Sequence, residues 1–233
     1  MRALVIQHDH VSPPGPVAER LLERGIETVL HPVVARDQFD SPGVTTEFPD
    51  PENFDLIIPM GSPWSVYDLD LIGSWVLPEL DLLRTADAAG VPVLGICFGG
   101  QLLAQAHGGA VSASSDPEIG WVDIATDDPD LIPTGPWFQW HSDRWQLPPG
   151  ATEIARNPAA SQAFVLRKNL AVQFHPELTS DMLRLWLNNG GAEIARDRGL
   201  DPDALQASAV AEDVAARARA YDLVDAFLAR FHH

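Results

Sequence analysis

The sequence feature that most constrains the fold is an apolar segment, residues 91–96, that runs directly into Cys97 and a helical segment over 98–107. Small residues stand two positions before and after the cysteine, at Gly95 and Gly99, which permits a sharp turn. Such a turn lifts the side chain clear of the sheet edge where open α/β sheets place their sites. The positive end of the following helix favours a thiolate. A lone cysteine is often a small buried core residue, but this frame predicts a nucleophile.

The segments before this turn alternate between two periodicities. Apolar runs predict strands at 3–7, 26–30 and 54–59, and helical spacing predicts helices from Val17 to Gly25 and over 75–89. Near-continuous apolar strands separated by helices are typical of a parallel sheet covered on both faces. The predicted fold class is therefore α/β, with an open, mostly parallel sheet and helices on both faces.

The pattern changes after residue 110. Short strand candidates follow one another without long helices, at 121–125, 137–140, 151–156, 162–166 and 170–174. They predict an antiparallel extension of the same sheet. From about 179 the chain turns helical, and an apolar stripe recurs at helical spacing up to Phe231. We expect a main domain over 1–180 and a helical C-terminal appendage over 181–233 packed on it, although the stripe could also form a homodimer or dock a separate synthetase.

The charge of the chain bears on its partners. Asp and Glu number 33 against 15 Lys and Arg, which gives a formal net charge of −18. A protein that binds nucleic acid or an anionic membrane through phosphates needs a basic face, so neither partner is expected. No apolar run approaches the ~18 residues of a membrane span, and the apolar run at the N-terminus is too short for a signal peptide. We expect a cytoplasmic protein, and one cysteine excludes an internal disulfide.

A candidate general base lies 78 residues after the cysteine. His175 ends an apolar strand, and Glu177 follows two residues later, close enough to orient the second ring nitrogen. A nucleophile, a base and an orienting carboxylate form the general triad arrangement. Taken alone, His175 would more often be structural and Glu177 a solvated turn residue. Together with Cys97 they predict a catalytic triad.

These residues carry a resemblance to a known family. The segments Gly95–Gln101 and Phe174–Glu177 resemble those of the class I, triad-type glutamine amidotransferases, in particular stand-alone proteins similar to the glutaminase domain of GMP synthase. Met60-Gly61-Ser62-Pro63 resembles the glycine-rich oxyanion loop of the family, followed by Ser65–Asp68, and Trp140–Asp143 resembles a segment that helps to hold glutamine. The resemblance covers roughly residues 1–180 and implies a flavodoxin-like fold.

The resemblance also implies roles. Cys97 would attack the side-chain amide of glutamine to form a thioester, and backbone N–H groups at Ser62 and Phe98 would hold the oxyanion. His175 would protonate the departing ammonia and then activate water. The implied substrate-binding residues are Gly61, Gln101, His141, Ser142 and Asp143. The loop departs from the Gly-Gly-Pro of the family at Ser62, which is less favourable than glycine if this residue needs a positive φ.

Three functions remain open from the sequence. The chain could be a glutaminase that supplies ammonia for an unknown acceptor, in particular a separate synthetase subunit. It could instead hydrolyse a γ-glutamyl peptide or amide by itself, or be a non-catalytic binding module. No P-loop or other nucleotide signature is present, so no cofactor is expected. His8 and His10 are too few ligands for a metal site, and we expect them in a loop near the mouth of the site.

Overall fold

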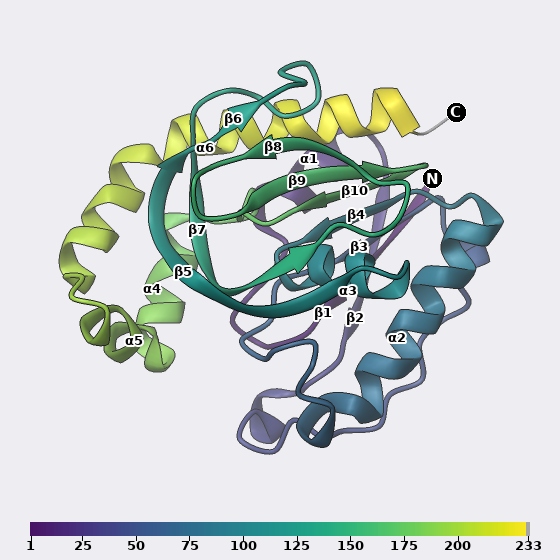
Figure 1. Cartoon of the computed structure of the whole chain (residues 1–233), viewed down its shortest axis with the longest axis horizontal. Helices are drawn as coiled ribbons and strands as arrows, with labels where there is room; N and C mark the ends of the chain where they lie inside the picture. Colours follow the sequence, from purple (N-terminus) through teal and green to yellow (C-terminus); the bar gives the residue numbers. More distant parts are fainter. Residues whose placement is uncertain (232–233) are drawn as a thin grey trace.

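The computed structural model describes residues 1–231 (Figure 1). The helices are α1 (Gly15–Glu23), α2 (Leu69–Ala89), α3 (Phe98–Ala106), α4 (Ser180–Trp186), α5 (Ala192–Asp197) and α6 (Pro202–Phe231). The strands are β1 (Arg2–Gln7), β2 (Glu27–Pro32), β3 (Leu56–Pro59), β4 (Val93–Ile96), β5 (Ala110–Asp123), β6 (Ala125–Thr126), β7 (Pro136–Gln146), β8 (Thr152–Arg156), β9 (Ser161–Leu166) and β10 (Asn169–Val172). Short 3₁₀ turns lie at Arg36–Gln38 and Pro51–Asn53, and a kinked segment, Leu187–Gly191, joins α4 to α5.

The main sheet has eight strands in the order β2-β1-β3-β4-β10-β9-β8-β6. The first five are parallel, and β9, β8 and β6 continue the sheet in antiparallel fashion. With β10 in fifth place, the parallel part has the flavodoxin-like strand order. The predicted parallel sheet is confirmed, and the predicted strands at 151–156 and 162–166 extend it in antiparallel fashion as β8 and β9. The strand expected at 170–174 was assigned to this extension wrongly, because β10 pairs in parallel with β4.

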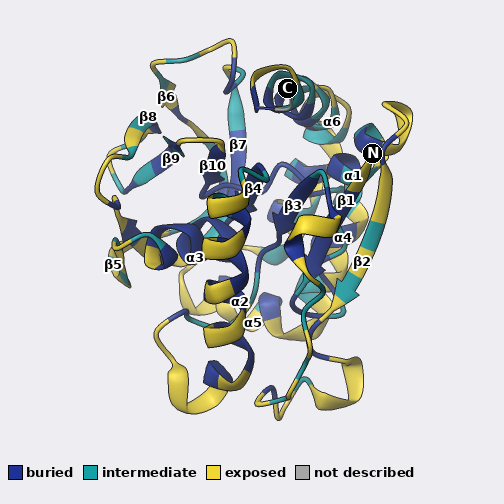
Figure 2. Cartoon of the chain, turned by 90° about the vertical axis from the view of Figure 1, so that its right-hand side faces the viewer, coloured by how far each residue is buried: buried dark blue, intermediate teal, exposed yellow. Residues whose placement is uncertain are grey.

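Alternate residues of the central strands face opposite layers. Ala3 and Val5 of β1 pack in one apolar cluster with side chains of α1 and α6. Leu4 and Ile6 pack in a second cluster with side chains of α2 and α3. Figure 2 shows the central strands β3 and β4 as buried and the outward face of α2 as exposed. Because successive side chains of a strand point to opposite faces, the apolar core forms two layers, one on each face of the sheet.

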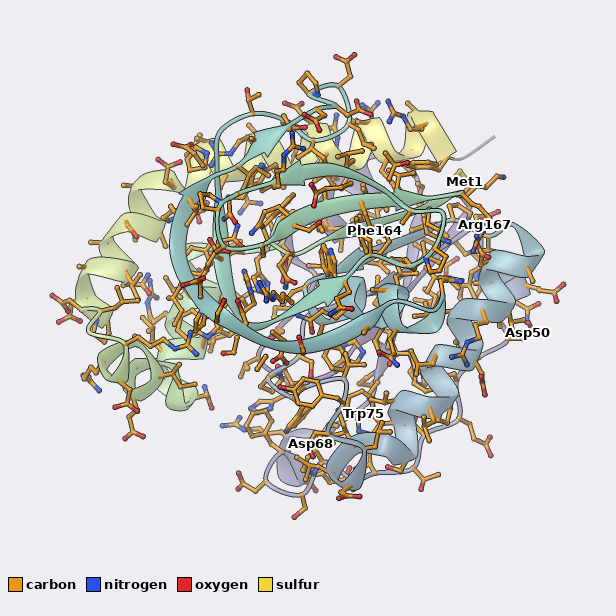
Figure 3. All side chains as sticks on the ribbon, in the orientation of Figure 1. Met1, Asp50, Asp68, Trp75, Phe164 and Arg167 are labelled. Carbon is orange, nitrogen blue, oxygen red and sulfur yellow. The ribbon has the colours of Figure 1, made fainter. Side chains whose placement is uncertain are left out.

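The strand pair β5–β7 corrects the predicted single sheet. These two long antiparallel strands form a separate sheet, with a register shift between Ala113 and Glu118. Trp145 of β7 packs on Phe164 of β9, with ring centroids 5.3 Å apart, which joins the two sheets. Phe164 is labelled in Figure 3. The expected strand at 121–125 is the end of β5, followed by the short strand β6. Side chains on much of β5 are exposed or half-buried, which explains why its apolar pattern is weak.

Helix α2 also begins earlier than predicted, at Leu69 rather than residue 75. Its first turns carry the exposed side chains of Leu69 and Leu71 together with Gly73, so no single apolar face marks them. The helix ends as expected at Gly90, whose φ of 73° suits a residue without a side chain.

Helix α6 packs along α1 (Figure 1). Its Leu223, Val224 and Phe227 belong to the same apolar cluster as strand β1. Asp225 accepts hydrogen bonds from Arg20 at 3.0 Å and Arg24 at 2.7 Å. Val224 and Phe231 of the predicted stripe are buried in this cluster, whereas Val210 and Val214 at its start are exposed, so only the C-terminal part of the stripe packs within the chain. The division of the chain at residue 180 and a homodimer both stay predictions.

Candidate active site

Cys97 stands at a strained turn between β4 and α3. Its φ is +50°, which side chains rarely adopt, and its N–H donates to the carbonyl of Val172 at 2.7 Å. A Cβ on Gly95 would lie 2.6 Å from the carbonyl oxygen of Gly99, and one on Gly99 would lie 2.0 Å from that of Pro59. The two glycines are therefore required by the close approach of β4, α3 and β3, as the sequence frame predicts.

His175 reaches the same edge of the sheet from the neighbouring strand. β10 runs parallel to β4 with Val172 beside Ile96, so the residues after both strands emerge together. His175 Nδ1 donates to Glu177 Oε1 at 2.7 Å, and both side chains are buried. A Cβ placed on Gly61 would lie 3.2 Å from His175 Cε1 and 3.9 Å from Cys97 Cβ, so this glycine adjoins both. The structure thus brings together the three residues of the predicted triad.

The environment of His175 favours its protonated form. Burial alone lowers the pKa of this imidazole. The carboxylate of Glu177 and the interaction with Cys97 outweigh burial and raise the pKa well above its usual value. A protonated imidazole beside Cys97 places a proton donor next to the candidate nucleophile.

Gln173 is a neighbour of the sulfur that the sequence reasoning missed. Its Nε2 lies 3.6 Å from Cys97 Sγ, and its Oε1 accepts from Gln101 Nε2 at 3.3 Å. Gln101 is buried behind Gln173 and also donates to the carbonyl of Asp143 at 3.4 Å. Gln173 stands two residues before His175, where strand periodicity places two side chains on one face, so the sequence did contain a signal.

The predicted oxyanion loop, residues 60–63, lies beside His175 and Cys97 at Gly61. Gly61 and Ser62 line the pocket described below, and Phe98 begins α3, where backbone N–H groups have no acceptor within the helix. Among the non-glycine residues 1–231, only Cys97 and Arg167 have positive φ. Ser62 therefore adopts an ordinary backbone conformation, and the departure from glycine does not strain the loop.

A pocket of about 100 Å³ opens beside His175. Its wall comes from the loops after β1 and β2, the predicted oxyanion loop, β7, the residues after β10 and the segment after residue 180. The lining residues are Asp9, Val11, Ser12, Phe39, Gly61, Ser62, Pro63, Trp140, His175, Trp186, Asn189, Gly191 and Ile194. The Trp186 ring meets that of His175 edge to face at 5.0 Å. The C-terminal segment, expected only as a packed appendage, thus contributes directly to the site.

The predicted substrate residues of β7 lie outside this wall. His141 is buried, and its Nε2 lies 3.0 Å from Glu118. Asp143 accepts from Ser65 Oγ at 2.6 Å and from Tyr67 at 2.9 Å, while Ser142 Oγ accepts from Arg198 at 2.7 Å. These bonds hold β7 to its neighbours. The contact of His141, Ser142, Asp143 and Gln101 with substrate stays a prediction.

His8 corrects another expectation. It lies directly after β1, fully buried rather than at the mouth of the site, with Nδ1 3.1 Å from the carbonyl oxygen of Gly61. Within residues 1–231, no three His, Cys, Asp or Glu side chains gather as metal ligands would. In the same range, no helix has both the length and the apolar character that crossing a bilayer requires.

The family model "Glutamine amidotransferase class-I" matches residues 16–190. GMP synthase (glutamine-hydrolyzing) of Aromatoleum aromaticum is 35% identical over 181 residues, which are 70% of this chain and 31% of that protein. One named subunit of the GMP synthase of Sulfurisphaera tokodaii is 37% identical over 137 residues, 54% of this chain and 69% of that polypeptide. The chain thus spans about a third of the length of GMP synthases such as the first.

Solved structures cover more of the chain. A glutamine amidotransferase from Methylobacillus flagellatus has a TM-score of 0.82 at 27% identity, and the similarity covers 98% of this chain and 94% of that one. A second, from Thermotoga maritima, shares the fold with a TM-score of 0.83 at 24% identity over 98% of both chains. The chain therefore belongs to the class I glutamine amidotransferase family.

Proposed function

We propose that this protein hydrolyses the side-chain amide of glutamine at Cys97, giving glutamate and ammonia. One observation carries the proposal: a cysteine held at positive φ adjoins a buried His175 that donates to Glu177 at 2.7 Å. This arrangement pairs a nucleophile with an oriented base at the edge of a pocket. Membership of the glutamine amidotransferase family supports glutamine as the amide.

The proposed reaction proceeds in two halves. The thiolate of Cys97 attacks the amide carbon, and the N–H groups of Ser62 and Phe98 hold the oxygen that becomes negative. As the tetrahedral intermediate collapses, the carbon–nitrogen bond breaks and the imidazolium of His175 gives its proton to the departing nitrogen, leaving ammonia and a thioester. Water then attacks the thioester and gives one proton to His175. Collapse of this second intermediate releases glutamate and restores the thiolate–imidazolium pair.

The ammonia acceptor is proposed to lie outside the residues of this chain. GMP synthases match it over about a third of their own length, and one relative is named as a single subunit of such an enzyme. These relatives support delivery of ammonia to a separate synthetase. Glutamine hydrolysis that rises when a synthetase is added would support this assignment.

One feature of the pocket favours a second candidate, hydrolysis of a γ-glutamyl peptide or amide by the chain alone. Trp140, Trp186 and Ile194 give the wall an apolar part. A group attached to the amide nitrogen could pack there, whereas the free amide of glutamine has no such group. Release of an amine from a γ-glutamyl anilide, faster than release of ammonia from glutamine, would favour this candidate.

The first experiment is intact-protein mass spectrometry after exposure to the chloroketone analogue of glutamine. Wild type and Cys97→Ser are compared, because serine is nearly isosteric and keeps the fold. A single adduct in wild type that is absent from Cys97→Ser supports a γ-glutamyl pocket with Cys97 as its nucleophile. No adduct, with or without cell lysate to supply a partner, would contradict the proposal and favour a binding module.

A further inference from the structure

A second histidine–glutamate pair lies behind the oxyanion loop. His8 follows β1, Glu79 belongs to α2, and both side chains are fully buried. His8 Nε2 lies 3.0 Å from each carboxylate oxygen of Glu79, and Nδ1 lies 3.1 Å from the carbonyl oxygen of Gly61. Neither residue lines the pocket. His8 therefore contacts the loop at Gly61, and Glu79 contacts His8, without either side chain forming part of the pocket wall.

Aromatic neighbours fix the ring of His8. It stacks on Trp75 of α2 with centroids 5.5 Å apart and meets Phe98 edge to face at 4.9 Å. Trp75 itself donates from Nε1 to the carbonyl of Pro42 at 2.8 Å, which limits its movement (Figure 3). His8 thus touches both residues, Gly61 and Phe98, next to which the oxyanion would bind.

The hydrogen-bond partners determine which atoms of His8 carry protons. A carbonyl oxygen can only accept, so Nδ1 donates to Gly61. Burial lowers the pKa of His8, but Glu79 and the bond to Gly61 outweigh it, and the pKa is raised above its usual value. Next to the Glu79 carboxylate the imidazole is protonated at both nitrogens, so Nδ1 keeps the proton that it donates to Gly61.

We propose that His8 and Glu79 are positioning residues that aim the Ser62 N–H into the oxyanion hole. The inference rests on the proposed amide hydrolysis at Cys97. Residues 1–231 contain no cis peptide bond, and the C=O and N–H of a trans peptide point in opposite directions. A Gly61 carbonyl held toward buried His8 therefore directs the Ser62 N–H away from His8, to the side where Gly61 adjoins Cys97 and His175.

The test compares two double variants that differ only in the donor. His8→Leu/Glu79→Leu removes the whole pair, because replacing both members of a buried ion pair with apolar residues is often neutral for stability. His8→Asn/Glu79→Leu keeps an amide nitrogen near the position of Nδ1. Rates of adduct formation at Cys97 are measured by intact mass, with the chloroketone analogue of glutamine and with iodoacetamide. Only the chloroketone places a carbonyl oxygen in the oxyanion hole while it reacts.

We expect His8→Leu/Glu79→Leu to slow the chloroketone reaction by about 10- to 100-fold and the iodoacetamide reaction by less than about twofold. His8→Asn/Glu79→Leu should react with the chloroketone at least about tenfold faster than His8→Leu/Glu79→Leu, since it retains the donor. If the leucine pair prevents folding, Glu79→Gln, which keeps the size of the side chain, should slow the chloroketone selectively. Equal slowing of both reagents, or no slowing, would overturn the inference. A wild type that the chloroketone does not modify would instead overturn the proposed function, and this inference with it.

Discussion

His175 and Glu177 stand two residues apart after β10, and the Nδ1 of the first lies 2.7 Å from the Oε1 of the second. Both side chains are buried, so little solvent weakens the interaction. The consequence is that the carboxylate both orients the ring and keeps it protonated. Removing its charge should therefore affect the pH dependence as well as the rate.

We predict that Glu177→Gln lowers the rate of the wild-type reaction by about 100-fold and moves its alkaline limb to lower pH. The pKa of His175 is raised with Glu177 as the main raising cause, so the neutral amide lets the imidazolium lose its proton at lower pH. The measurement is the pH–rate profile of chloroketone adduct formation. An unchanged alkaline limb would show that Glu177 does not keep the imidazole of His175 protonated.

Gly99→Ala should destabilise the turn at Cys97 by about 3 kcal/mol or more, because the backbone has to shift. The added Cβ would lie 2.0 Å from the carbonyl oxygen of Pro59. Gly73→Ala in α2 is the matched control, since its Cβ would meet only the Leu69 side chain, with Cβ at 3.4 Å. The control should gain up to about 1 kcal/mol. Urea unfolding of both variants measures the difference, and equal effects would contradict this account.

Phe227→Ala should lower the free energy of unfolding by about 3–5 kcal/mol. The Phe227 side chain is 1% exposed and packs in the core cluster that includes β1. Val214→Ala on the same helix is the control, because Val214 is 83% exposed. Deletion of residues 200–233 should destabilise the fold for the same reason. A truncated chain with the melting temperature of the full chain would instead favour two independent parts.

The His8–Glu79 pair should make stability depend on pH. The pKa of His8 is raised above its usual 6.5 in the folded protein. The protonated His8 therefore contributes fully to the free energy of unfolding below pH 6.5, and this contribution is lost as the pH rises through the pKa of the folded state. Glu79→Gln removes the carboxylate that raises the pKa of His8 against the opposite effect of burial. We therefore expect the stability difference between wild type and Glu79→Gln to be largest near about pH 6 and to shrink toward about pH 9. Urea unfolding across this range measures it, and a difference that grows with pH would have the wrong sign.

The turn at Cys97 and the parallel sheet could be predicted because their determinants are local. The Gly-x-Cys-x-Gly frame lies within five residues, although Gly99 also closely approaches Pro59 of the neighbouring strand β3. Strands buried on both faces are apolar throughout, which marks them in the sequence. The triad was predictable for a related reason. The carboxyl ends of parallel strands meet at one edge, so residues after two such strands lie together.

Other features depend on pairings that the sequence does not mark. β5 carries many polar, exposed residues, and only its partner β7 defines it as a strand. The His8–Glu79 bond joins residues 71 positions apart, and neither has a neighbour in sequence that signals it. Trp186, at the end of α4, reaches His175 across 11 positions of sequence, and no periodicity marks this contact. Such contacts follow from tertiary packing and could not be derived from periodicity.

The wall of the pocket has a consequence for how such a protein can diversify. Cys97 and His175 follow the sheet strands β4 and β10, whereas Phe39, Asn189 and Ile194 of the pocket wall lie outside the strands. Under the proposed function, substitutions in these outer segments would change which compound binds and would leave Cys97 and His175 in place. This part of substrate choice could then be engineered separately from the groups proposed to break the amide bond.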